Sequence, residues 1–256
     1  EQASGHPNVL PLIDADVYDG QVAIVSEYAD GGSLADFLKI EGGRIAFRRA
    51  AEIAVGILSG LEYLHGKNIV HRDIKPANVL LQNGTPRLAD FGISRAMTTI
   101  DFSSSIVGTE SYMSPEAFEG VRSVQTDVWS VGVVLYQMLA GFLPFAQVHP
   151  TETMYAVLMK EPAPLPADVP AQLAEIVFKS LEKDRTANIN QPRRYQTAAA
   201  MRDDLKSFLE MQPAAANGDT AVIPVMPLAE MDEDYATRVK IPVKIKYDNF
   251  WQSILN

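Results

Sequence analysis

The longest uncharged segment of the sequence constrains the fold most. Residues 128–148 run for 21 positions without an acidic or basic side chain, which is enough apolar length to span a bilayer. Gly141 and Pro144 would end a helix about two thirds of the way along this segment. Ser130 and Gln137 interrupt its apolar character, and no basic cluster flanks it as expected beside a membrane. We therefore predict a helix that is buried on all sides in a protein core.

The composition is typical of a folded acidic protein. The 256 residues, 47% of them hydrophobic, can build one large domain or two small ones around a substantial core. The 32 acidic residues exceed the 22 basic ones, and the net charge of −10 repels nucleic acids and anionic membrane surfaces. Nucleic acid is therefore not expected as a partner.

The absence of cysteine narrows the chemistry available to the chain. Without a thiol there can be no disulfide, no thiol catalysis and no cysteine-ligated metal centre. The four histidines are scattered without a metal-binding spacing, so any metal should be held by oxygen atoms. No signal or transit peptide is recognisable in the first residues, and we expect a cytoplasmic location.

The first third of the chain predicts strands followed by two helices. Residues 9–13 and 22–27 are strand-like, and Ser33 can cap a short helix with Asp36 as the reciprocal partner. Apolar positions at helical spacing predict an amphipathic helix over 47–65, with Gly66 as its stop.

Turn and periodicity signals continue along the chain. Asn83-Gly84 between two short apolar runs predicts a tight β-hairpin. Further helices are predicted at four places: from about Thr126, and over 151–160, 171–182 and 197–209. After Glu210 the composition changes to Pro, Ala and acidic residues without periodicity, which indicates a linker or tail. Within it, residues 238–251 alternate enough to form an edge strand.

Four motifs lie in a fixed order between these elements. HRDIKPANVLL at 71–81 is followed by DFG at 90–92, SPE at 114–116 and DVWSVGV at 127–133. In this order and spacing, with a hairpin between the first two, they resemble the motifs of eukaryotic-type (Hanks) protein serine/threonine kinases. The compact loops and the ending RYQTAAAMRDDLKSFL at 194–209 resemble bacterial members of that family. The resemblance covers roughly residues 6–209. It implies an α+β, bilobal protein-kinase fold with a mostly helical large lobe (C-lobe).

The resemblance assigns the catalytic roles residue by residue. It makes Asp90 and Asn78 the ligands of Mg²⁺, or of Mn²⁺ in its place, both of which prefer oxygen donors. Asp73 would face the acceptor hydroxyl and take its proton, and Lys75 would neutralise the γ-phosphate of ATP. Thr109 resembles the residue that hydrogen-bonds this aspartate and lysine. The pairing of Lys75 with Thr109 implies serine/threonine rather than tyrosine specificity.

Nucleotide contacts are implied along the connector between the two lobes. The carbonyl of Glu27 and the N–H of Ala29 would meet the adenine edge, Leu80 would lie under the ring and Ser33 near the ribose. Ser26 would occupy the gatekeeper position, and its small side chain would leave an open pocket behind the adenine.

Other residues are implied to support the site rather than to react. This structural group contains His71, Arg72, Phe91, Gly92, Glu116, Asp127 and Arg194. Asp127 would accept backbone N–H bonds from the catalytic loop, and Glu116 would form a buried ion pair with Arg193 or Arg194, the second being favoured by its place before an aromatic residue. Arg72 implies control by phosphorylation of the polar segment that follows DFG, where Ser103 and Ser105 are the favoured candidates. A plain flexible polar loop is the alternative.

One part of the kinase pattern is absent from these 256 residues. There is no GxGxxG, and QVAIV at 21–25 carries Val25 where the lysine strand of the family has its lysine. We therefore expect an incomplete small lobe (N-lobe) without its first three strands and most of its helix. The expected domains are 1–32 for the lobe remnant and hinge, 33–209 for the C-lobe and 210–256 for a tail.

The expected function is transfer of the γ-phosphate of ATP to Ser/Thr hydroxyls of protein substrates, with a transient dimer for autophosphorylation. The chain by itself should transfer phosphate feebly or not at all, because the glycine loop and lysine that orient the nucleotide are lacking. The alternative is a non-catalytic scaffold of the pseudokinase type that binds partners through its C-lobe.

Overall fold

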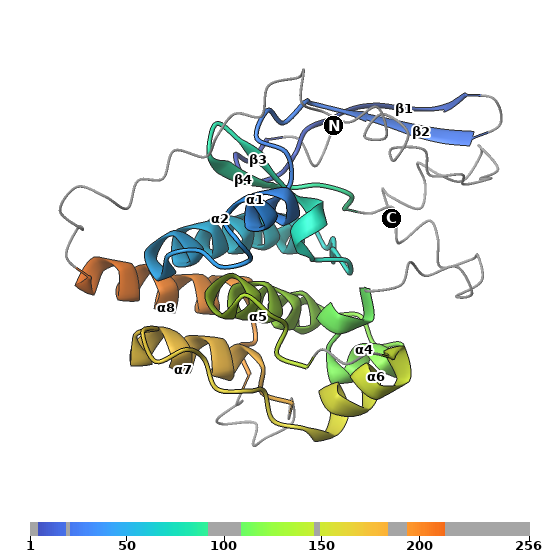
Figure 1. Cartoon of the computed structure of the whole chain (residues 1–256). Helices are drawn as coiled ribbons and strands as arrows, with labels where there is room; N and C mark the ends of the chain where they lie inside the picture. Colours follow the sequence, from blue (N-terminus) through green and yellow to red (C-terminus); the bar gives the residue numbers. More distant parts are fainter. Residues whose placement is uncertain (1–4, 19–20, 92–108, 146–148, 184–193, 213–256) are drawn as a thin grey trace.

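The computed structural model describes residues 5–18, 21–91, 109–145, 149–183 and 194–212. Within them the chain is mostly helical, with two small antiparallel sheets of two strands each. Figure 1 shows the helices lying in roughly parallel layers, with both sheets at one end of the helical body. No helix in these described ranges has the length and apolar character needed to cross a membrane.

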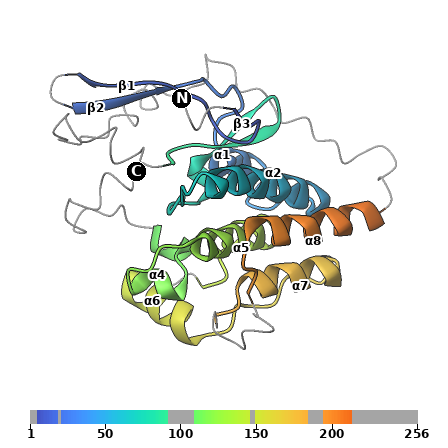
Figure 2. The ribbon, with the colours of Figure 1, turned by 180° about the vertical axis from the view of Figure 1, so that it is seen from behind.

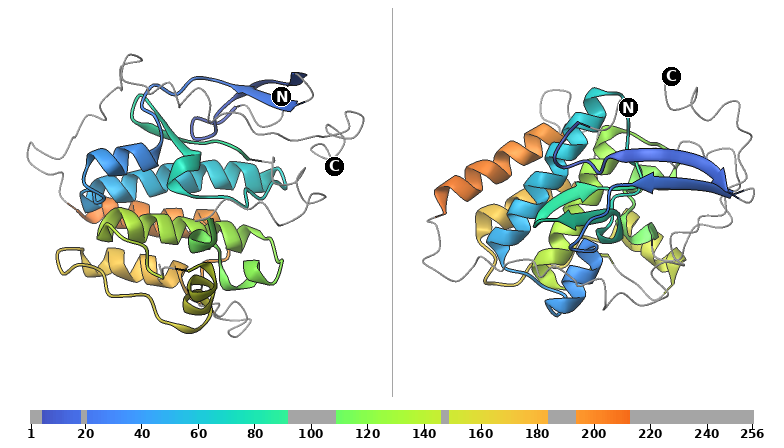
Figure 3. Two further views of the ribbon diagram at one scale, coloured as in Figure 1. Left: turned by 45° about the vertical axis from the view of Figure 1, so that its right-hand side comes forward. Right: turned by 90° about the horizontal axis from the view of Figure 1, so that it is seen from above.

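The first sheet is a hairpin of β1 (Leu12–Tyr18) and β2 (Gln21–Ser26). Seen from above, it extends away from the helical body (Figure 3). The predicted strand at 9–13 is wrong in its position, because Val9 bridges to Leu88 of the second sheet and Leu10 donates its N–H to the same residue's carbonyl at 2.9 Å. Both residues are buried there. Their contacts with the second sheet keep them out of the first hairpin, where their apolar pattern had predicted a strand.

The second sheet pairs β3 (Val79–Gln82) with β4 (Thr85–Leu88). The hairpin predicted from Asn83-Gly84 is confirmed: both residues have positive φ, 49° and 77°, as a type I′ turn requires. The side chains alternate between buried and half-buried, so one face of the sheet packs inward. That face contacts α2 (Phe47–Gly66).

Two helices precede the second sheet. The short α1 (Leu34–Ile40) begins at Ser33, whose side chain accepts from the Asp36 N–H while the Asp36 carboxylate accepts from the Ser33 N–H, which confirms the predicted capping box. The long α2 matches its periodicity and ends at Gly66, the residue predicted as its stop. Asn68 takes the left-handed conformation at φ 60° just beyond the end.

Residues 128–140 of the uncharged segment lie in the central helix α5 (Val124–Ala140), and twelve of the 17 helix residues are buried. Ser123 caps its start together with Thr126, and Gly141 ends it in the left-handed conformation at φ 83°. The helix packs against α2, α7 (Ala171–Ser180) and α8 (Ala198–Met211), as Figures 1 and 2 show from opposite sides. The prediction of a buried helix is confirmed.

Two further helices complete the described part. The short α4 (Pro115–Phe118) and α6 (Pro150–Met159) contact each other at one end of the helical body. Two short 3₁₀ turns, η1 (Pro76–Asn78) and η4 (Thr109–Tyr112), precede β3 and α4 in the chain. The predicted edge strand at 238–251 lies outside the described residues.

Candidate active site

Residues 71–78 connect α2 to β3 and form the loop on which the predicted chemistry depends. Asp127, buried in the first turn of α5, holds the start of this loop through its carboxylate. Its Oδ2 accepts the His71 N–H and its Oδ1 accepts the Arg72 N–H, each at 2.8 Å. Arg72 has a positive φ of 73°, an uncommon conformation for a residue with a side chain. Two charge-assisted hydrogen bonds to a rigid helix fix that conformation.

His65 is a supporting residue that the sequence alone did not reveal. It lies at the end of α2, and its Nε2 is 2.8 Å from Oδ2 of Asp127, the same oxygen that accepts the His71 N–H. The only sequence signal is its place six residues before His71, which no periodicity argument would select. Asp127 therefore links the end of α2, the loop of residues 71–78 and α5.

The loop brings three of the predicted catalytic residues into direct contact. Lys75 Nζ donates to Asp73 Oδ2 at 2.9 Å, and Asn78 Nδ2 donates to the same oxygen at 2.8 Å. Asn78 also donates to the Asp73 backbone carbonyl at 2.8 Å. The second carboxylate oxygen of Asp73 is buried and accepts no hydrogen bond from the described residues. A proton donor brought to that oxygen would find an acceptor already oriented.

Asp90 follows β4 and lies beside this loop. The N–H of Ala89 donates to the Asn78 carbonyl at 2.9 Å, and the Ala89 carbonyl is 3.0 Å from Nε2 of the fully buried His71. Asp90 itself has a positive φ of 62°. Its side chain reaches solvent, yet removal of water by the surrounding protein raises the pKa of its carboxyl. The nearby Asp73 carboxylate adds to that rise, and Lys75 opposes it.

The His71 side chain connects two parts of this arrangement through a hydrogen bond to the Ala89 carbonyl. A carbonyl oxygen can only accept, so the Nε2 of His71 must carry the proton that it donates to Ala89. Burial lowers the pKa of His71, which keeps the ring neutral at pH 7. The ring therefore ties the loop of residues 71–78 to the residue before Asp90.

The oxygen donors of this cluster suit a magnesium ion. Because the Asn78 amide nitrogen is bonded to Asp73, the Asn78 side-chain oxygen is left without a hydrogen bond in the described part of the chain. Together with the Asp90 carboxylate it offers hard oxygen ligands. No group of three or more His, Cys, Asp or Glu side chains in the described ranges forms a metal cluster, so a site here would use the amide and nucleotide oxygens as well.

The connector of residues 27–32 runs alongside β3 and is hydrogen-bonded to it. Gly31 N donates to Leu81 O and Leu81 N to Gly32 O, each at 2.9 Å. A side chain at Gly31 would put a Cβ 2.8 Å from the Leu81 carbonyl, so only glycine allows this approach. Buried Ala29 lies within the connector, and neither its N–H nor the Glu27 carbonyl takes part in a hydrogen bond among the described residues.

Leu80 and Ser33 lie where the connector meets the second sheet. They form an isolated antiparallel bridge, and Leu80 is half-buried. The Ser33 hydroxyl donates to Asp36 Oδ2 at 2.5 Å, so it already has a partner in the capping box. The exposed Ser26 ends β2 and pairs with Leu12.

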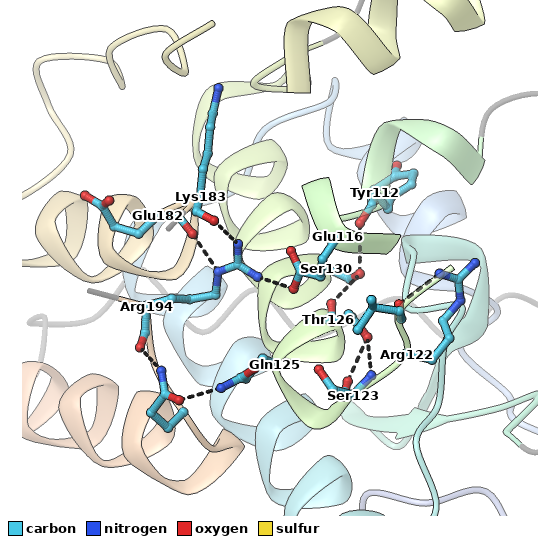
Figure 4. A network of polar contacts seen from close by, with 12 residues as sticks. Tyr112, Glu116, Arg122, Ser123, Gln125, Thr126, Ser130, Glu182, Lys183 and Arg194 are labelled. Atoms are coloured by element: carbon cyan, nitrogen blue, oxygen red, sulfur yellow. Dashed lines mark hydrogen bonds and ion pairs between the residues drawn. The ribbon is translucent and has the colours of Figure 1, made fainter. Parts of the chain in front are cut away.

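A buried ion pair joins Glu116 of α4 to Arg194, which precedes α8. Arg194 Nη1 lies 2.6 Å from Glu116 Oε1, and both side chains are buried (Figure 4). The Arg194 guanidinium also donates to the Glu182 carbonyl at 2.6 Å and lies 4.8 Å from the Trp129 ring centroid. Of the two arginines left open by the sequence, Arg194 pairs with Glu116, and Arg193 lies outside the described residues.

Some predicted residues lie where the structure gives no account of them. Gly92, Ser103 and Ser105 fall outside the described residues, and Thr109 is described only as the start of η4. Phe91 is half-buried and packs against the hydrophobic core.

Comparison with known proteins agrees with this geometry. The sequence pattern of the protein kinase domain family matches residues 1–210. The chain belongs to the protein kinase domain family. A probable serine/threonine-protein kinase of Clostridium perfringens is 32% identical over 247 residues, covering 94% of this chain and 34% of that protein.

Two further relatives are named as bacterial serine/threonine kinases. A probable serine/threonine-protein kinase of Streptomyces coelicolor is 38% identical and covers 82% of this chain and 32% of its own length. The serine/threonine-protein kinase PknB of Mycolicibacterium smegmatis is 37% identical, covering 79% of this chain and 33% of its own length. The chain thus spans about a third of the length of these relatives.

Proposed function

We propose that this chain carries the catalytic centre of a protein serine/threonine kinase, which transfers the γ-phosphate of ATP to Ser or Thr hydroxyls. The observation that supports it most is the cluster in which Lys75 and Asn78 both donate to one oxygen of Asp73, with Asp90 beside them. Phosphoryl transfer needs positioned charge more than covalent chemistry, and this cluster supplies positioned charge.

Each residue of the cluster has one task in the proposed reaction. Asp73 would orient the acceptor hydroxyl and take its proton at the buried oxygen that accepts no bond from the described residues. Lys75 would place its ammonium against the transferred phosphoryl group. Asn78 and Asp90 would hold Mg²⁺, which would neutralise charge on the nucleotide phosphates.

The connector would bind the adenine of ATP. The Glu27 carbonyl and the Ala29 N–H are an acceptor and a donor two residues apart, and no described hydrogen bond uses either. Leu80 would contact the flat face of the ring. A ribose contact by Ser33 would compete with its bond to Asp36, so we give that contact a minor part.

Regulation through Arg72 belongs to the same proposal. The backbone of this arginine is fixed by Asp127, and its side chain would pair with a phosphate on the polar segment after DFG, with Ser103 and Ser105 as the favoured acceptors. Phosphopeptide mapping after incubation with ATP tests this assignment: phosphate found at neither serine would remove it.

The 256 residues should transfer phosphate slowly by themselves. They contain no GxGxxG and no lysine in the strand at 21–25, so one side of the nucleotide would lack its usual contacts. The residues that act on the acceptor and the metal are nevertheless all present. We therefore expect slow but real chemistry and not a pure scaffold.

A phosphotransfer assay with the chain in excess over a Ser/Thr peptide mixture tests this proposal. Transfer to Ser and Thr peptides, absent for Tyr peptides, is expected from the wild type with ATP and Mg²⁺. Asp73→Ala and Asp90→Ala should reduce the rate to background. Asp168→Ala, a change at an exposed carboxylate between α6 and α7, should leave it unchanged.

A rate that is indifferent to Asp73→Ala would refute the proposal. Absence of transfer by the wild type would favour the scaffold.

A further inference from the structure

The hairpin β1–β2 has an open edge on each side. Within the described residues each of its strands pairs only with the other. The hairpin extends away from the helical body (Figure 3), and its apolar residues Ile13 and Val25 are 63% and 42% exposed. A sheet of two strands is marginal in water, and an open edge is a template on which a further strand can pair.

The sequence of this hairpin carries only negative charge. Residues 12–28 contain no Lys or Arg, and their four acidic residues are Asp14, Asp16, Asp19 and Glu27. Three of the four lie in β1 or directly after it in the sequence. The negative charge is therefore concentrated along β1.

The register of the hairpin separates acidic from apolar positions. Residues paired across two strands share a face, and successive residues along a strand alternate between the faces. One face receives the pairs Asp14–Val25 and Asp16–Ala23, and the other receives Ala15–Ile24 and Val17–Val22. Along β1, one face thus has acidic positions and the other has apolar positions.

A second segment of the chain has the complementary pattern. Residues 238–247 (RVKIPVKIKY) belong to the stretch that predicts an edge strand, and they lie outside the described residues. They include no acidic residue. Basic residues occupy four even-numbered positions, and apolar residues occupy the odd-numbered positions between and beside them: Arg238, Lys240, Lys244 and Lys246 against Val239, Ile241, Val243 and Ile245. As a strand, this segment would have one basic face and one apolar face.

Pro242 decides which edge of such a strand can pair. Successive residues of a strand direct their N–H groups toward opposite edges, and proline has no N–H to offer. Because Pro242 is one of the even-numbered residues, the odd-numbered residues would supply the hydrogen bonds to a partner strand. The basic face and the proline are therefore compatible with a single arrangement at a sheet edge.

We propose that residues 238–247 of this chain add to the free edge of β1 as a third strand, with their basic face beside Asp14 and Asp16. Main-chain hydrogen bonds supply the affinity, and opposite charges on neighbouring strands favour the register. The apolar face of the added strand continues that of the hairpin. The added strand supports β1–β2, which leads into the connector, and this role requires no phosphotransfer.

The chain between the two segments is long enough for this contact. Residues 213–237 connect the described end of the chain, just after α8, to the proposed strand. A chain of that length spans up to about 80 Å when extended. A domain of this size has a radius of gyration of only about 16 Å, so the connection can reach any part of its surface.

Disulfide trapping tests the pairing in the full chain, which contains no cysteine of its own. Asp14→Cys, at an exposed position of β1, is combined in turn with a cysteine at each basic and each apolar position of residues 238–246. Mild oxidation should give an intramolecular disulfide with at least one even-numbered position. Every odd-numbered position should give at least tenfold less, because a disulfide needs Cβ atoms about 4 Å apart, which only residues on the same face provide.

The control places the first cysteine elsewhere. Glu175→Cys also replaces an exposed acidic residue, but it lies in α7, at the far end of the helical body from the hairpin (Figure 1). It should give no disulfide with any of the same positions. Trapping by Asp14→Cys without a preference for even positions would overturn the proposal, and so would no trapping at all. Disulfides found only between two chains would place the segment on a second copy and would also overturn it.

Hydrogen exchange gives a second reading that needs no cysteine. Lys240→Glu combined with Lys244→Glu should speed the exchange of the β1 amides at least fivefold, because like charges would then meet along β1. Lys160→Glu combined with Lys206→Glu makes the same change in net charge at two exposed lysines of the helical body and should leave this exchange as in the wild type. Unchanged exchange in the first variant, or equal acceleration in both, would contradict the proposal. Neither experiment measures phosphotransfer, so this proposal and the proposed function fail separately.

Discussion

The described part of the chain contains two antiparallel hairpins of two strands each, and they differ in how well the rest of the protein covers them. β3–β4 packs its inner face on α2, receives the buried Val9 as a bridge to Leu88 and is joined to the connector through Leu80 and Leu81. β1–β2 extends away from the helices (Figure 3), and its apolar Ile13 is 63% exposed. An isolated hairpin is marginal in water, so its stability depends on what covers it.

The difference explains where the proposed chemistry is located. Asn78 precedes β3 and Asp90 follows β4, so the well-supported hairpin fixes the two residues proposed to hold the metal. The exposed hairpin leads into the connector proposed for adenine. We therefore expect a rigid catalytic cluster and a looser nucleotide-binding edge, and the following predictions test that contrast.

The largest expected effect is at the junction of β4 with the helices. Leu88 is fully buried, so Leu88→Ala should lower the free energy of unfolding by about 2–5 kcal/mol through lost contacts and a cavity. Ile13→Ala, the matched truncation in β1, should change it by less than about 0.5 kcal/mol. Urea denaturation of both variants gives the comparison. Equal losses would mean that the two hairpins are equally supported.

A smaller effect is expected from two glycines of the same helix, α2. A Cβ at Gly60 would lie 2.5 Å from the Asn8 carbonyl, in the segment that leads to Val9, so Gly60→Ala should destabilise the chain by about 1–3 kcal/mol. A Cβ at Gly66 would meet nothing within 4 Å. Gly66→Ala should therefore stabilise the chain by up to about 1 kcal/mol through helix propensity. Melting temperatures that shift in the same direction would contradict this account of how α2 holds the second sheet.

The smallest effect is a dependence of stability on pH that arises from His71, which bonds to Ala89 directly after β4. Burial lowers the pKa of His71 in the folded chain, so below about pH 6.5 the unfolded chain binds the proton more readily. The stabilising contribution of His71 is complete above that pH and is lost as the pH falls, by at most about 1.4 kcal/mol per pH unit. The neighbouring carboxylates of Asp127, Asp73 and Asp90 oppose the shift.

Urea denaturation at pH 7 and at pH 5.5 measures this dependence. His71→Gln should flatten the profile, because glutamine keeps an N–H donor for Ala89 and takes up no proton. His6→Gln is measured in the same way, because burial also lowers the pKa of His6 and this residue would contribute to the same pH dependence. An unchanged profile in His71→Gln would show that the histidine does not couple the loop to β4 through a neutral ring.

Local sequence signals predicted the elements that local physics controls. The cap at Ser33, the turn at Asn83-Gly84 and the end of α5 at Gly141 depend on neighbours within a few residues, and each was predictable. The buried helix followed from the absence of charge over 128–148. These features need no knowledge of the fold.

Tertiary contacts account for the residues that the sequence did not reveal. Val9 and Leu10 look like strand residues, but Leu88, almost 80 positions away, draws them to the second sheet. His65 gains its significance from Asp127, which is distant in sequence. The motifs drew attention to the loop at residues 71–78 because their resemblance to a known family carries the long-range information that periodicity lacks.

The most direct test of the account is whether Mg²⁺ tightens nucleotide binding through the cluster at the ends of β3 and β4. Calorimetric titration of a non-hydrolysable ATP analogue into the chain should give a lower Kd with Mg²⁺ than without it. Asp90→Asn should abolish that difference, and Asp73→Asn, which alters the proposed proton acceptor, should preserve it. An equal Mg²⁺ effect in the wild type and Asp90→Asn, or no nucleotide binding by the wild type at all, would contradict the central claim.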